Sequence, residues 1–250
     1  MKNEKIYDLL EKYRKELISA DASSIIVPNG ICYDGIVNED LFEKSNKVLF
    51  LLKETNGEDK DRDSQEGYED WNYRNWLEFQ QHKNLEEPSY GKRNFYRTFY
   101  NVGMWSDLLN GNVELSFQEY MKSGGLAEEN LRFQLGKVAL VNLKKTWGGA
   151  STQWKALKNY LKNDSVRDVL RTQVSIIEPE IVICGSSEVY EFAKDIFGIN
   201  LEETIDTSKK KIRVFEYQRI KFVEFYHPAC RKGREFLYEF CQDVAKQINF

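Results

Sequence analysis

Short apolar runs alternate along the chain with longer amphipathic segments. The clearest runs are residues 47–52 (KVLFLL), 137–143 (KVALVNL) and 180–184 (EIVIC). Runs of this length without alternating polar residues are typical of strands buried on both faces of a parallel sheet. Two further strand-like segments follow at 211–215 and 219–225, with a turn between them. The pattern therefore predicts a sheet of mainly parallel strands.

The segments around these strands carry apolar residues at every third or fourth position, which is the spacing of one face of an α-helix. Because strands alternate with helices, we expect one α/β domain over residues 1–250, with helices on both faces of the sheet. The predicted helices span residues 3–19, 92–110, 126–135, 152–177 (one or two helices), the stretch after 187 through 197, and 232–248.

A polar, acidic stretch at about residues 58–90 interrupts the alternation, with one helix expected around 71–81. Loops of this length inside a compact domain usually have a function, and a solvated surface insertion is the simpler alternative. Oxygen ligands suit Mg²⁺, but Lys60 and Arg62 interrupt the acidic run, so a metal-dependent hydrolase is the least favoured function. The acidic residues in question are Glu54, Glu58, Asp59, Asp61 and Asp63.

Composition narrows the function classes further. The net charge of −4 argues against broad electrostatic binding of duplex nucleic acid. Four cysteines without a CxxC pair predict no zinc or iron–sulfur site, and we expect no metal or cofactor. No apolar run approaches the ~18 residues of a membrane helix. The charged first segment is unlike a signal peptide, so we expect a cytoplasmic protein with no membrane contact.

Polar or glycine-containing turns follow four of the predicted strands. The carboxyl ends of parallel strands meet at one edge of an α/β sheet, where ligands bind, so these turns are expected to converge. Together they offer a carboxylate, two amides, one imidazole and helix-start backbone amides that suit an anion such as phosphate. The four turns are KETNGED (53–59), NLKKTWGG (142–149), CGSSE (184–188) and YHPACRKG (226–233).

The order of these four segments resembles the uracil-DNA glycosylase superfamily, over most of the chain from residue 47 to the end. KETNG is similar to that superfamily's first motif, Gly-Glu-Ala-Pro-Gly, with Glu54 and Gly57 matching. Asn142 matches its strand-end base-reading Asn, EPEIVICGSS its third strand and glycine turn, and YHPA its His-Pro-Ser/Ala motif. The departures are Lys53, Thr55 and Asn56 in the first motif and Cys230 and Arg231 after the last.

The resemblance implies a three-layer α/β/α sandwich around a central, mainly parallel four-stranded sheet. It also implies that a target base is taken out of the stack into a tight pocket. His227 would donate a hydrogen bond to the departing base and so stabilise its developing negative charge. A carboxylate or amide of the first motif would position the water: Glu54 would hold it or make another contact of that motif, and Asn56 is the amide. These three are the expected catalytic residues.

The same resemblance implies a set of substrate-binding residues. Asn142 would read the edge of the base, and Gly57 would complete the first motif. By the resemblance Arg231 would contact a backbone phosphate, whereas the helix start at Ser186 is expected to face an anionic group because of its backbone amides. An aromatic ring would stack on the base, with Phe95 preferred. The aromatic candidates are Phe95, Tyr96 and Phe99.

Two functions follow as expectations. The first is a DNA base-excision glycosylase acting on a deaminated base such as uracil, in single- or double-stranded DNA. The alternative is a non-catalytic module of the same fold that binds a nucleobase, nucleotide or nucleic acid. Simpler roles remain open for the same residues: His227 and Ser186 as helix caps, Asn142 as a turn former, Glu54 as an ion-pair partner, and the aromatic residues at 95–100 as core.

Overall fold

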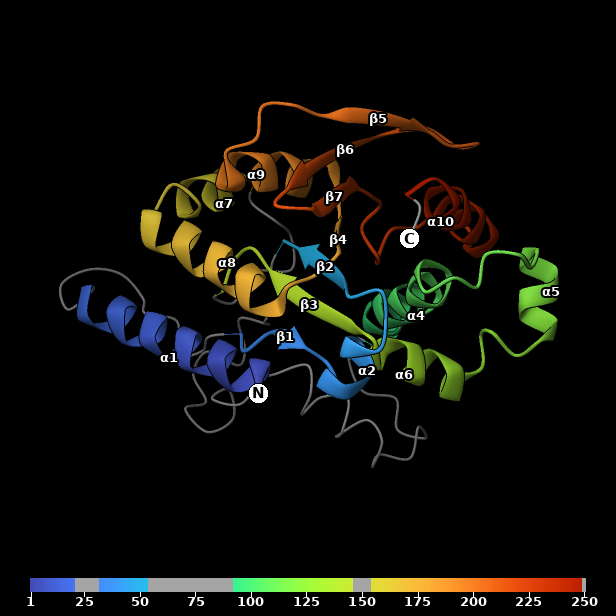
Figure 1. Cartoon of the computed structure of the whole chain (residues 1–250), viewed down its shortest axis with the longest axis horizontal. Coiled ribbons are helices and arrows are strands. Elements are labelled where there is room, and N and C mark those ends of the chain that lie inside the picture. Colours follow the sequence, from blue (N-terminus) through green and yellow to red (C-terminus); the bar gives the residue numbers. More distant parts are fainter. Residues whose placement is uncertain (21–31, 54–91, 146–153, 249–250) are drawn as a thin grey trace.

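One sheet runs through the computed structural model, which describes residues 1–20, 32–53, 92–145 and 154–248. Seven strands form it in the order β1-β3-β2-β4-β7-β6-β5 (Figure 1). The central strands β3, β2, β4 and β7 are parallel to one another, and β1, β6 and β5 pair antiparallel. The strands are β1 (Gly35–Ile36), β2 (Val48–Leu52), β3 (Val138–Asn142), β4 (Ile181–Cys184), β5 (Glu203–Asp206), β6 (Lys211–Tyr217) and β7 (Ile220–Glu224).

The expected α/β class with a mainly parallel sheet is confirmed, and the sheet has seven strands where four were predicted. β1 has only two residues, too few to leave a pattern in the sequence. β5 reads ETID and is largely exposed, so it has no apolar face to predict it. β6 and β7 were expected, and they join through a tight turn in which Gln218 and Arg219 both have positive φ.

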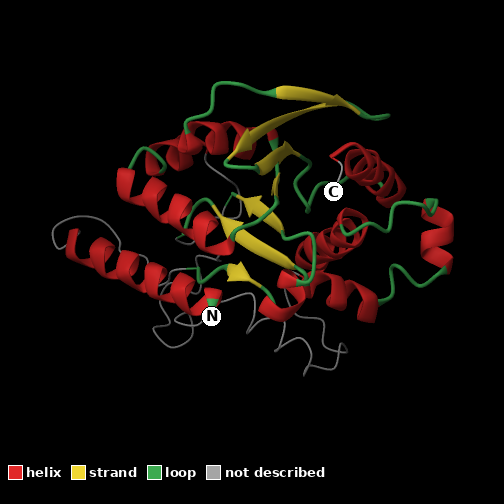
Figure 2. Ribbon diagram, in the orientation of Figure 1, coloured by secondary structure: helices red, strands yellow, loops and turns green. Residues whose placement is uncertain are grey.

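Helices cover both faces of the sheet, as Figure 2 shows. α1, α8 and α9 pack on one face, and α4, α6 and α10 on the other. The segment predicted at 152–177 forms two helices, α7 and α8, and Asn163 caps the second. The helices are α1 (Lys2–Ala20), α2 (Glu39–Glu43), α4 (Lys92–Leu109), α5 (Phe117–Lys122), α6 (Glu128–Gly136), α7 (Trp154–Tyr160), α8 (Asp164–Ile177), α9 (Ser187–Phe197) and α10 (Arg234–Ile248).

β2 lies at the centre and shows why the strands are continuously apolar. All five of its residues are buried. Val48 and Phe50 enter the core under α4 and α10, and Leu49 and Leu51 enter the core under α1, α8 and α9. Successive side chains of a strand point to opposite faces, so a strand covered on both sides needs apolar residues at every position.

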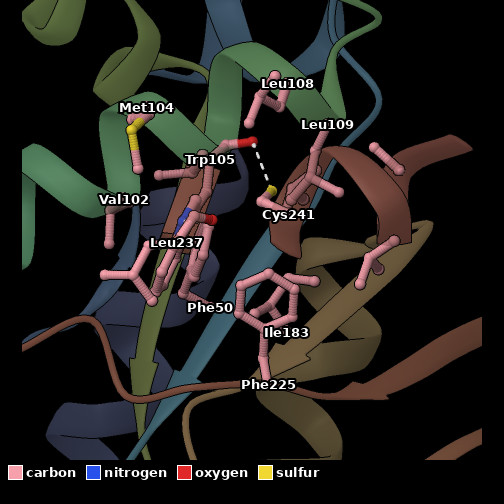
Figure 3. Packing of buried hydrophobic residues seen from close by; sticks show 14 of the residues in the cluster. Phe50, Val102, Met104, Trp105, Leu108, Leu109, Ile183, Phe225, Leu237 and Cys241 are labelled. Atoms are coloured by element: carbon pink, nitrogen blue, oxygen red, sulfur yellow. Dashed lines mark hydrogen bonds between the residues drawn. The ribbon is translucent and has the colours of Figure 1, made fainter. Parts of the chain in front are cut away.

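Trp105 of α4 anchors the core beneath α10 (Figure 3). Its ring packs edge-on against Phe225, with centroids 4.8 Å apart, and lies nearly parallel to Phe50 at 6.3 Å. Its indole N–H donates to the carbonyl of Leu237 at 3.3 Å, and its own carbonyl accepts from the Cys241 thiol at 3.9 Å. This residue therefore fixes α4 and α10 against the sheet.

Some expectations fall on residues that the structure does not describe. The insertion at 58–90 and the helix at 71–81 lie outside the described residues. Among the described helices, none has the length and apolar character that crossing a bilayer requires.

Candidate functional site

The ends of the central strands lie side by side at one edge of the sheet. The pairing of β2 with β3 continues beyond the strands, because the Lys144 N–H donates to the Lys53 carbonyl at 3.0 Å. On the other side of β2, the Gly185 N–H donates to the Leu51 carbonyl at 2.9 Å. The first described residues after β2, β3 and β4 therefore lie side by side, as the parallel topology predicted.

Gly185 also brings the turn after β7 to this edge. A Cβ at Gly185 would lie 2.9 Å from Cδ2 of Leu52, 3.3 Å from the carbonyl oxygen of Leu51 and 3.5 Å from Cδ of Pro228. Only a residue without a side chain lets these three segments approach so closely. The glycine turn after β4 thus seats the His-Pro segment against the end of β2.

His227 belongs to that segment, and a hydrogen bond from the backbone determines which nitrogen of its ring carries the proton. The Ala229 N–H donates to Nδ1 of His227 at 3.1 Å. Burial, and then the positive charge of Lys53, lower the pKa of the imidazole to about 4. At neutral pH the ring is therefore uncharged, and because Nδ1 accepts a hydrogen bond, the single ring proton belongs on Nε2. His227 is a neutral imidazole with one N–H to donate.

A buried side-chain amide of α4 also holds the His-Pro segment in place. Asn101 of α4 is 2% exposed, and its Nδ2 donates to the carbonyl of Pro228 at 2.6 Å. Sequence reasoning missed this residue. The sequence does offer one indication of its role, because Asn101 is an amide among the mostly apolar residues that α4 packs against the core.

Asn142 is at the end of β3, where the sequence predicted it, but its side chain is enclosed. The residue is 1% exposed. Its backbone N–H donates to Oδ2 of Asp34 at 2.5 Å, and its Nδ2 lies 3.3 Å from the same oxygen and 3.6 Å from Sγ of Cys32. The amide therefore belongs to a polar cluster within the core.

Asp34 and Lys145 form the centre of that cluster, and neither was predicted. Lys145 Nζ lies 2.8 Å from Asp34 Oδ1, and both side chains are fully buried. Gln173 of α8 adds a third buried donor, with Nε2 2.8 Å from the same oxygen. A backbone hydrogen bond joins the two segments that supply the ion pair: the Cys32 N–H donates to the Lys145 carbonyl at 2.8 Å. The ion pair thus holds residues 143–145, which directly follow Asn142, against the core.

Ser186 acts as a helix cap. Its side chain accepts from the N–H of Val189 at 3.2 Å, which satisfies one of the free amides at the start of α9. The next residue, Ser187, donates to Glu224 at 2.6 Å. Although burial opposes ionisation, hydrogen bonds from Ser187 and Arg213 lower the pKa of Glu224, so this carboxylate is charged at the end of β7.

The remaining predicted residues are placed only in part. Glu54, Asn56 and Gly57 lie outside the described residues, so their convergence with His227 stays a prediction. Phe95 belongs to α4, and Arg231 is exposed in the segment between β7 and α10.

The described part of the site can donate a hydrogen bond from a neutral imidazole and present positive charge at its rim. Among the residues placed in the structure, no cluster of three His, Cys, Asp or Glu side chains could hold a metal ion. The acidic run that suggested Mg²⁺ lies outside those residues. The chain matches no protein-family model and no curated protein.

Proposed function

We propose that the chain is a DNA base-excision glycosylase of the uracil-DNA glycosylase type, acting on a deaminated base such as uracil. The observation that supports it best is the state of His227: a neutral imidazole whose Nδ1 accepts from a backbone N–H, at the carboxyl edge of a parallel sheet. A neutral donor at this edge suits a leaving group that gains negative charge.

The reaction separates charge, which defines what the site must do. As the bond between sugar and base breaks, positive charge develops on the sugar and negative charge on a carbonyl oxygen of the base. The Nε2–H of His227 would stabilise that oxygen in the transition state. Water, positioned by Glu54 with Asn56, then adds to the sugar carbon, and the proton that it loses neutralises the departed base anion. An imidazole that stays neutral keeps this N–H donor through the whole neutral pH range.

The arrangement of the strands supports the same proposal. The central parallel strands β3, β2, β4 and β7 would correspond to the four-stranded sheet of the resemblance, and each motif follows one of them. Of the predicted roles, base reading by Asn142 has the least support, because its side chain is buried beside Asp34.

That burial favours the second candidate, a binding module of the same fold that takes a nucleobase, nucleotide or single strand without cleaving it. Such a module needs a stacking surface and positive charge at the strand ends, but no amide to discriminate between bases. It predicts saturable binding without product.

Gel-based cleavage of single- and double-stranded oligonucleotides containing uracil or hypoxanthine tests the proposal. We expect the wild type to release the base, and His227→Ala to lose that activity. Lys137→Ala, at the opposite edge of the sheet, is the control and should cleave like the wild type. Failure of the wild type to cleave any of these substrates would refute base excision and leave the binding module.

A further inference from the structure

A half-buried tryptophan lies beside the strand ends on the face covered by α8 and α9. Trp154 is the first residue of α7, and its ring centroid is 6.3 Å from that of Phe192 in α9. Lys53 Nζ, directly after β2, lies 5.9 Å from the same ring. Lys53 is also the charge that acts on His227. An aromatic surface therefore adjoins the cation whose charge acts on the proposed catalytic residue.

The charge of Lys53 is not neutralised within the described part of the chain, where no carboxylate lies within ion-pair distance of it. Other lysines of the fold differ in this respect, since Lys210 pairs with Glu224 at 3.1 Å. An aromatic ring next to an unneutralised cation is the combination that binds single-stranded nucleic acid: bases stack on the ring, and the cation attracts the phosphates.

A second group of cations lies on the other face of the sheet, after the His-Pro segment. The Arg234 guanidinium lies 4.2 Å from the centroid of the Tyr100 ring, and Lys232 Nζ lies 5.4 Å from that of Phe236. Phe236 packs against the core under α4 and α10, whereas Trp154 packs against the opposite core. The segment that contains His227 leads directly into this second region, and Lys53 of the first region acts on its ring.

We propose that Trp154 stacks a nucleobase neighbouring the excised one, with Lys53 contacting the phosphate between them, and that this subsite selects single-stranded DNA. The inference rests on the proposed nucleic-acid function and adds its substrate class. In a duplex both faces of a base are covered by its neighbours, so only an unpaired strand offers a face to Trp154. The net charge of −4 points the same way, because it disfavours broad contact with a duplex.

Fluorescence anisotropy tests the subsite with a labelled, uracil-free single-stranded oligonucleotide and its duplex. Uracil-free probes separate binding from cleavage. We expect Trp154→Leu to weaken single-strand binding about tenfold, a typical loss for one base–aromatic stack. Trp154→Phe keeps an aromatic face and should lose much less. Phe133→Leu is the matched control: Phe133 is 50% exposed and has Lys137 Nζ 4.7 Å from its ring, but it belongs to α6, which precedes β3.

Three outcomes decide the matter. Single-strand binding that depends on Trp154 supports the subsite even if the wild type cleaves nothing, in which case base excision fails and the subsite stands. Equal Kd values for Trp154→Leu and the wild type overturn it, whether or not uracil is cleaved. Wild-type binding of the duplex as tightly as the single strand, or of neither, also overturns it.

Discussion

The buried ion pair between Asp34 and Lys145 offers a test of how the end of β3 is held in the core. Both side chains are fully buried, and the closest N···O distance is 2.8 Å. Replacing Lys145 by Met keeps much of the side-chain volume but leaves the carboxylate with neutral donors only, from Gln173 and Asn142. Breaking a buried pair from one side typically costs about 3–5 kcal/mol. We expect Lys145→Met to lower the free energy of unfolding by that amount.

A double-mutant cycle isolates the interaction. Asp34→Asn should cost about as much as Lys145→Met, because it leaves a buried ammonium without a counter-charge. The double variant has no uncompensated charge, so its cost should fall below the sum of the two single costs by about 1–3 kcal/mol. Urea unfolding followed by circular dichroism gives the four values.

An exposed ion pair provides the control. Lys211 and Asp206 are 3.4 Å apart, with side chains 74% and 75% exposed. Lys211→Met should change the free energy of unfolding by less than about 1 kcal/mol. If Lys145→Met costs no more than Lys211→Met, or if the two core substitutions are additive, the pair does not stabilise the end of β3 as described.

Three further predictions concern the His-Pro segment. Gly185→Ala should lower stability by about 1–3 kcal/mol through crowding against Leu52 and Pro228, and slow any cleavage; unchanged urea unfolding would contradict the close approach. Asn101→Leu leaves the Pro228 carbonyl unpaired and should cost about 1–3 kcal/mol, measured in the same way. Because the pKa of folded His227 is about 4, below its ordinary value of about 6.5, the unfolded chain takes up this proton first. Wild-type stability should therefore fall between pH 6.5 and 4 relative to His227→Gln, by at most about 3 kcal/mol; parallel pH profiles would contradict the lowered pKa.

The central strands could be predicted because burial on both faces leaves an unbroken apolar run, as in β2. β5 could not, since its residues are held by pairing with β6 rather than by burial. The convergence of the strand ends followed from parallel topology alone.

The polar partners within the core could not be predicted. Asp34 and Lys145 are far apart in sequence, and nothing local to either marks the other as its partner. The same holds for Asn101 and Pro228, which only the packing of α4 brings together. Asn142 shows the consequence: its position was predicted, and the direction of its side chain depends on Asp34.

The most direct test of the account is the single-turnover rate of uracil release from single-stranded DNA between pH 5.5 and 8, for the wild type and His227→Ala. If His227 is a neutral donor, its protonation state does not change in this range, so it should give the wild-type rate no pH dependence. His227→Ala should lower the rate by about 10²–10³-fold. A rate that falls as pH rises through about 6.5, as expected of an imidazolium acid, would contradict the neutral donor. Equal rates for the two proteins would remove His227 from the chemistry.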